Sequence, residues 1–129
     1  MKKLNEAVKN LLNNSKTWIM STKDTTPNAV PLLFKKVAND DTLVLFDVFM
    51  KKSIENIKKN GQVAITVYDE NTLEGYQLKG TATHTTDANL ITEGNTITNP
   101  FKLTTKGAVL VKIDEVFVLT PGPDNGKTL

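Results

Sequence analysis

The sequence contains no cysteine and no arginine, and it has a single histidine, His84. The absence of cysteine excludes disulfides, thiolate nucleophiles and cysteine-ligated metals. A single histidine cannot form a histidine metal cluster. Arginine usually provides bidentate recognition of phosphates, carboxylates and guanine edges. All 16 basic residues here are lysines, so any anion must be bound by lysine, by hydroxyl groups or by the backbone.

Aromatic residues, net charge and long hydrophobic runs are also scarce. Aromatic residues make up 6% of the chain and do not alternate with lysines along any expected strand, and the net charge is only +2. Both observations argue against nucleic acid as a partner. No apolar run approaches the roughly 18 residues that a membrane-spanning helix needs. Lys2 and Lys3 are not followed by an apolar segment, so we expect no signal peptide and a cytoplasmic protein.

The remaining composition is that of an ordinary globular domain. The chain has 129 residues, of which 39% are hydrophobic and 23% charged. This length suffices for one well-formed core, and the sequence shows no repeat and no sign of a second domain. We therefore expect a single domain over residues 1–129.

Hydrophobic periodicity predicts a mainly β fold of the α+β class. Leu4, Val8, Leu11 and Leu12 repeat with helical spacing, which indicates an amphipathic helix over Lys3–Asn13. Six strands are expected, over Thr17–Thr22, Ala29–Val37, Leu43–Phe46, Gln62–Tyr68, Tyr76–Thr85 and Ala108–Thr120.

Two glycine- or proline-containing segments interrupt this pattern. Gly80 predicts a kink within its strand, because glycine in a strand often marks a bulge. Thr86–Thr105 is polar, and Asn99-Pro100 forbids a continuous helix, so we expect an irregular segment with at most a short helix. Six strands with short helices between them suggest an antiparallel β-barrel.

The segment Leu43–Lys59 carries the main functional signal. Its apolar strand runs through a turn into Lys51, Lys52 and Ser53, with Ser53 a natural N-cap for a helix over Ile54–Lys59 and Asn60-Gly61 a natural stop. The N-terminus of a helix carries roughly half a positive charge, so two lysines there are unfavourable unless an anion binds. Backbone N–H groups, a hydroxyl and two ammonium groups could converge on one phosphate. The alternative is that both lysines are solvated and that Glu55 alone satisfies the helix dipole.

Other apparent motifs have simpler explanations. The C-terminal tail resembles a P-loop, but Gly122 is one residue too close to Gly126-Lys127, so we expect no phosphate-binding loop there. His84 has no acidic partner nearby in the sequence, which favours a packing role over that of a catalytic base. Asp40-Asp41 and Asp114-Glu115 are adjacent pairs whose side chains point to opposite faces of a strand, so neither pair forms an acid–base dyad.

Four blocks, in this order, resemble the FMN-binding split-barrel family, which includes pyridoxamine 5′-phosphate oxidase and small FMN-binding proteins. They are WIMSTKDTTPNAVPLLFKKV, DTLVLFDVFMKKSIENIKKNGQVAITVYD, GYQLKGTATHTTD and VFVLTPGPDNGK. The resemblance covers most of the chain and implies a six-stranded antiparallel split β-barrel with a few short helices. It also implies a homodimer with FMN at the subunit interface.

The resemblance further implies a set of FMN-binding residues. The phosphate would lie at Lys51, Lys52 and Ser53. The isoalloxazine ring and ribityl chain would lie along Val30–Leu33, and the turn Asp47–Met50 would also contact the flavin. A flavin would also be approached by Tyr76, Gln77 and the turn Thr120–Pro121–Gly122. This flavin could be the one bound by the partner subunit. The residues of the ring-binding segment and of the turn are Val30, Pro31, Leu32, Leu33, Asp47, Val48, Phe49 and Met50.

The implied function is that of an FMN-dependent oxidoreductase with a small-molecule electron donor or acceptor. Pyridoxamine 5′-phosphate oxidases use arginines at both the flavin phosphate and the substrate phosphate, so the absence of arginine argues against that particular activity. Two alternatives remain: a non-catalytic flavin electron carrier, and a split barrel that binds another cofactor such as a deazaflavin or haem. The sequence does not identify the substrate.

Overall fold

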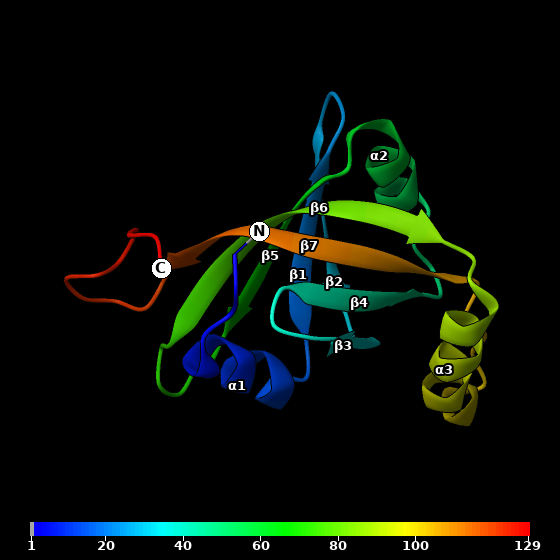
Figure 1. Cartoon of the computed structure of the whole chain (residues 1–129), viewed down its shortest axis with the longest axis horizontal. Helices are drawn as coiled ribbons and strands as arrows, with labels where there is room; N and C mark the ends of the chain where they lie inside the picture. Colours follow the sequence, from blue (N-terminus) through cyan, green and yellow to red (C-terminus); the bar gives the residue numbers. More distant parts are fainter. Residues whose placement is uncertain (1) are drawn as a thin grey trace.

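The computed structural model describes residues 2–129 as a strongly curled antiparallel sheet with three α-helices around it (Figure 1). The helices are α1 (Glu6–Asn14), α2 (Lys52–Asn60) and α3 (Ala88–Thr98), and a 3-10 turn, η1 (Asn99–Phe101), follows α3. The strands are β1 (Trp18–Lys23), β2 (Pro27–Leu32), β3 (Lys35–Val37), β4 (Thr42–Asp47), β5 (Gln62–Tyr68), β6 (Gly75–Thr85) and β7 (Gly107–Val118).

The order of the strands explains why the sheet curls. It runs β2-β1-β5-β6-β7-β4-β3, so the two edge strands are consecutive in the chain and only Leu33 and Phe34 separate them. The three Cα–Cα steps from Leu32 to Lys35 reach at most about 11 Å. The two edges of the sheet must therefore approach each other at this point. The result is the expected split barrel.

The expected strand Ala29–Val37 is in fact two strands, so the described residues contain seven strands instead of the predicted six. β2 pairs with β1, whereas β3 pairs with β4 on the opposite edge. The chain changes neighbours at Leu33 and Phe34 without an obvious breaker there. Strand-forming residues continue across Leu33 and Phe34, so the sequence pattern did not show where one strand ends and the next begins.

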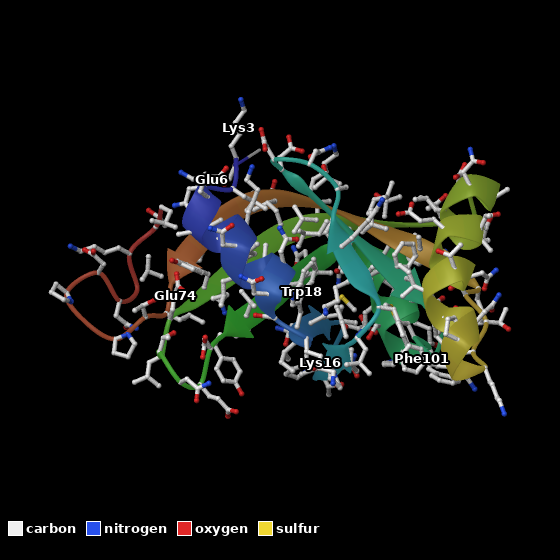
Figure 2. The ribbon with its side chains drawn as sticks, turned by 90° about the horizontal axis from the view of Figure 1, so that it is seen from below. Lys3, Glu6, Lys16, Trp18, Glu74 and Phe101 are labelled. Atoms are coloured by element: carbon white, nitrogen blue, oxygen red, sulfur yellow. The ribbon has the colours of Figure 1, made fainter. Side chains whose placement is uncertain are left out.

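Most of the hydrophobic core lies inside the curled sheet. α1 covers this core with Val8, Leu11 and Leu12, and the indole nitrogen of Trp18 donates a hydrogen bond to the Leu12 carbonyl at 3.0 Å. Figure 2 shows Trp18 beside the C-terminal end of α1. The helix begins three residues later than predicted, because the side chain of Asn5 accepts from the Val8 N–H and forms the cap.

A second, smaller cluster lies on the other face of β4, beneath α3. Val44, Phe46 and Ala108 form its centre, while Leu43 and Leu45 point into the main core. All six residues of β4 are therefore buried. This burial on both faces accounts for the uninterrupted apolar run in the sequence.

Thr86–Thr105 was expected to be irregular with at most a short helix, but α3 occupies 11 of its residues, so the prediction underestimated its helix content. Its sequence is poor in helix formers, but the Asp87 carboxylate caps the Leu90 N–H at 3.1 Å. Tertiary contacts hold the rest: the Thr98 and Thr105 hydroxyls lie 3.0 Å apart, and Asn95 accepts from the Thr105 N–H at 2.8 Å. The expected break at Asn99-Pro100 is confirmed, since α3 ends at Thr98.

Two glycines behave as predicted. The ladder between β6 and β7 shifts register between Lys79 and Gly80, where a Cβ atom would collide with the Lys112 carbonyl oxygen. Gly61 ends α2 with φ +68°, a conformation that favours glycine. In residues 2–129 no helix is both long and apolar enough to cross a membrane.

Candidate functional site

A cavity of about 450 Å³ opens between β2, the end of β4 and the N-terminus of α2. Such a volume is typical of small-molecule sites. Three segments meet there: edge strand β2 with the two residues after it, the turn after β4, and the first residues of α2. The lining residues are Asn28, Val30, Pro31, Leu32, Leu33, Phe34, Phe46, Val48, Phe49, Met50, Lys51, Lys52 and Ser53.

The fold brings two of the predicted segments together at this cavity. Val30–Leu33 forms one wall, and Val48–Ser53 forms the facing turn and helix end. They are adjacent because β2 and β4 lie near the two edges of the sheet that the Leu33–Phe34 connection draws together.

Asp47 does not line the cavity. Its carboxylate is buried and accepts a hydrogen bond from the Met50 N–H at 3.0 Å. This contact closes the turn Asp47–Met50. Asp47 therefore affects the cavity indirectly, by fixing the turn whose residues line it.

The N-terminus of α2 is the polar end of the cavity. The helix starts at Lys52, and Lys51 occupies the cap position without a side-chain hydrogen bond. Ser53 is therefore not the N-cap that the sequence suggested but the second residue of the helix, and it is buried at 2% exposure. The backbone N–H groups of residues 52–54 have no acceptor within their own helix. An uncapped helix end with a buried serine and two exposed lysines is suited to an anion.

Ser53 belongs to a polar network that extends beneath the cavity. The side-chain amide of Asn28 donates to the Ser53 hydroxyl at 3.1 Å and to the Thr22 hydroxyl at 3.3 Å. The amide of Asn56 donates to the same Thr22 hydroxyl at 3.0 Å, while its own oxygen has no partner. The network joins β1, β2 and α2.

An exposed ion pair also connects β1, β2 and α2 at the protein surface. The Lys59 ammonium lies 2.7 Å from the Asp24 carboxylate, which sits in the turn between β1 and β2. The hydrogen bond from Lys59 lowers the pKa of Asp24. This pair holds the β1–β2 hairpin against α2.

The second group of predicted residues lies elsewhere. Tyr76, Thr120 and Pro121 line a different cavity, of about 290 Å³, formed with the C-terminal tail. Gln77 lines neither cavity and faces Phe117 in the β6–β7 ladder. The two groups share no cavity within this chain.

Tyr76 is held in place by its acidic neighbour. The phenol donates to the Glu74 carboxylate at 2.8 Å. Burial, and then this hydrogen bond, raise the pKa of Tyr76 to about 12. The tyrosine is thus a neutral donor at ordinary pH.

Sequence reasoning missed the acidic neighbour of His84. Its Nε2 atom lies 3.6 Å from the Asp47 carboxylate, and both side chains are largely buried. The two residues are far apart in the sequence and become neighbours only through the pairing of β4 and β6 with β7. No local pattern could have revealed this contact.

The cavity also contains residues that the sequence did not single out. Asn28, Phe34 and Phe46 all line it. Phe34 and Asn28 flank the predicted segment Val30–Leu33, so proximity in the chain was the available signal. Phe46 was assigned to the core. In residues 2–129 no cluster of three or more histidine, aspartate or glutamate residues could hold a metal ion.

A family model and a curated relative each match most of the chain. The family model described as pyridoxamine 5′-phosphate oxidase matches residues 4–117. An uncharacterized protein of Methanocaldococcus jannaschii is 34% identical over 128 residues, covering 96% of this chain and 85% of the relative.

Solved structures show the same fold. HupZ of Group A Streptococcus superposes with a TM-score of 0.82 at 23% identity, covering 95% of this chain and 99% of HupZ. An FMN-binding protein from Syntrophomonas wolfei gives 0.76 at 16% identity, covering 88% of this chain and 84% of that protein. An F420 reductase superposes with a TM-score of 0.67 at 16% identity, covering 88% of this chain and 98% of the reductase. At such identities the likeness concerns the fold.

Proposed function

This chain belongs to the pyridoxamine 5′-phosphate oxidase family, and we propose that it binds FMN in the cavity between β2 and α2. The observation that carries the proposal is the composition of this cavity. One end is an uncapped helix N-terminus with Lys51, Lys52 and buried Ser53, whereas the rest of the wall is mainly apolar. A ligand with a phosphate at one end and a flat ring at the other fits this division.

The phosphate would bind at α2. The N–H groups of the first turn and the ammonium groups of Lys51 and Lys52 are donors only. The Ser53 hydroxyl accepts from the Asn28 amide and has its own hydrogen to donate. Charge-assisted hydrogen bonds to phosphate are stronger than neutral ones. The chain thereby compensates for its lack of arginine.

The ring would lie along β2. Val30, Leu32 and Val48 provide apolar surface there. Because β2 is an edge strand, one side of its backbone pairs with no other strand, and its N–H and C=O groups are available to the polar edge of a ring. Pro31 lacks an N–H group, so it can offer only its carbonyl.

A second copy of the chain would complete the site. Leu33 and Phe49 line the cavity but are 56% and 76% exposed, and Phe101, near Phe34, is 66% exposed. Figure 2 shows Phe101 at the end of the molecule that bears α3. Large apolar side chains around a cavity mark an interaction surface. A homodimer would cover them and exclude water from the flavin.

We propose that the bound FMN serves an oxidoreductase whose electron donor or acceptor is a small molecule. FMN supplies the hydride and electron transfer, while the residues of this chain bind it, orient it and shield it from water. Pyridoxamine 5′-phosphate oxidation itself is not proposed, because the chain lacks arginine.

The first test is the visible spectrum of the purified protein before and after incubation with FMN and desalting. We expect a two-band flavin spectrum with about one FMN per chain. A protein that does not retain FMN but retains a deazaflavin or haem would overturn the choice of cofactor. Turnover with a reduced nicotinamide would distinguish an oxidoreductase from a flavin carrier.

The second test locates the phosphate. Lys52→Ala should weaken FMN binding several-fold, through the loss of a charge-assisted contact. Lys58→Ala is the matched control, because Lys58 is also exposed and lies in the last turn of the same helix. Equal affinities of the two variants, measured by fluorescence titration, would contradict the placement of the phosphate.

A further inference from the structure

Asp47 is a buried carboxylate with a single hydrogen bond in the described part of the chain. It accepts from the Met50 N–H at 3.0 Å, although a carboxylate offers about four lone-pair sites. A buried charge is costly unless another charge pairs with it. In residues 2–129 the only group within 4.0 Å of this carboxylate that can carry a positive charge is the imidazole of His84, whose Nε2 atom lies 3.6 Å away.

A glycine allows these two side chains to meet across a strand. β7 lies between β4 and β6 (Figure 1), and Gly107 of β7 pairs with Asp47 in the ladder. A Cβ atom at position 107 would lie 2.9 Å from Nε2 of His84, so the imidazole occupies the space that a side chain there would need. The side chains of His84 and Asp47 are only 15% and 6% exposed. The surrounding sheet therefore holds them beside each other.

The contact changes character when His84 takes up a proton. At 3.6 Å the two groups are too far apart for a hydrogen bond, so a neutral imidazole does little for the buried carboxylate. A protonated imidazole provides the missing countercharge, and because that charge spreads over the ring, the attraction does not depend on which way the ring is turned. A histidine normally changes its charge between pH 5 and 8, and this chain has only one histidine.

The other ionisable groups of the neighbouring elements are exposed or already paired. The buried residues of α2 carry no ionisable group, and all its charged residues are exposed. Asp87, which follows β6, caps the N-terminus of α3. Glu93 of α3 is paired with a lysine of β3, and Lys106, just before β7, is exposed. The charge of His84 is therefore the one that acts on Asp47 at close range in the described residues.

We infer that His84 and Asp47 form a pH-sensitive switch, in which protonated His84 holds the Asp47 carboxylate, and with it the turn Asp47–Met50, in the arrangement that binds the ligand. The three residues after Asp47 all line the main cavity. When His84 loses its proton, the buried carboxylate loses its countercharge and its hold on the Met50 N–H weakens. The inference concerns the turn itself, and its effect on flavin affinity rests on the proposed function.

The first measurement needs no ligand. In a two-dimensional proton–nitrogen NMR spectrum, the Met50 amide resonance reports the hydrogen bond to Asp47. It should move between pH 5 and 8 together with the ring resonances of His84. His84→Gln keeps a hydrogen-bond donor but takes up no proton, and Asp47→Asn keeps an acceptor for Met50 but has no charge. In both variants the Met50 resonance should stay in place over this range.

Asp41→Asn is the matched control. Asp41 is also an aspartate of this segment, but it lies at the opposite end of β4 and contacts Lys112 at 3.9 Å. Its replacement removes a carboxylate charge without touching the switch. The Met50 resonance of this variant should move with pH as in the wild type.

The second measurement compares FMN affinity at pH 5.5 and 8 in the wild type and in His84→Gln. Both proteins bind the same ligand, so any titration of its phosphate cancels in the comparison. From pH 5.5 to 8 the affinity of the wild type should fall at least about fivefold more than that of the variant, which is the lower end of typical coupling between two sites.

The outcomes separate the inference from the proposal beneath it. A Met50 resonance that does not follow His84, or that still moves in His84→Gln, would overturn the switch. Equal pH dependence of FMN affinity in the wild type and His84→Gln would also overturn it. A protein that binds no FMN at either pH would overturn the proposed function, and the Met50 resonance would then decide the inference alone. If His84→Gln does not fold, Asp47→Asn takes its place in both measurements.

Discussion

Replacing Gly94 by alanine should have two opposite effects on stability, one from helix propensity and one from packing. Gly94 lies in the middle of α3, where alanine normally stabilises a helix by about 1 kcal/mol relative to glycine. In this structure, however, a Cβ atom at position 94 would lie 2.7 Å from both the Cγ2 and Oγ1 atoms of Thr105 and 2.8 Å from Cδ1 of Phe46. Such separations require something to move.

The neighbours of Gly94 cannot move cheaply. Thr105 is 2% exposed and is held by the Thr98 hydroxyl at 3.0 Å and by Asn95 at 2.8 Å, and Phe46 is also 2% exposed. Overpacking of this kind costs about 1–3 kcal/mol. Set against the gain in helix propensity of about 1 kcal/mol, we expect a net destabilisation of up to about 2 kcal/mol. For a chain of this size that lowers the melting temperature by up to roughly 8 °C.

The measurement is urea unfolding of the wild type and Gly94→Ala, with Thr92→Ala as the control. Thr92 is an exposed residue of the same helix, so its replacement by alanine should be neutral or slightly stabilising. Because Phe46 lines the main cavity, Gly94→Ala should also alter ligand binding. A Gly94→Ala variant at least as stable as the wild type would refute the packing argument for α3.

Two further predictions concern the second cavity and the assembly. Burial and Glu74 raise the pKa of Tyr76 to about 12, from 10.0, so the unfolded chain loses this proton first as the pH rises. Stability should therefore fall between about pH 10 and 12, and Tyr76→Phe should lessen that fall when urea unfolding is compared at pH 9 and 11; parallel profiles would contradict the role given to Tyr76. Light scattering at about 10 μM should give twice the chain mass of 14.2 kDa, and Phe49→Lys should reduce it to one chain, because a charge would replace an apolar contact. A monomeric wild type would exclude the dimer.

The sequence alone was sufficient wherever the cause of a structure is local. The spacing of Val8, Leu11 and Leu12 predicted a helix, and Gly61 predicted the end of another. The turn and the helix after Leu43–Phe46 were also predicted, although the sequence placed the start of that helix at Ile54 and the structure places it at Lys52. These features depend on residues within a few positions of each other. Periodicity, propensity and end signals describe such neighbours well.

Only the tertiary structure decided the features that depend on distant residues. α3 forms despite weak propensity because Thr98 and Asn95 are held by distant Thr105. The strand Ala29–Val37 divides because its two halves pair with opposite edges of the sheet. The network beneath the cavity joins three elements, and the contact between His84 and Asp47 joins two strands across a third. Packing and strand pairing bring these groups together, and neither leaves a mark in any short stretch of sequence.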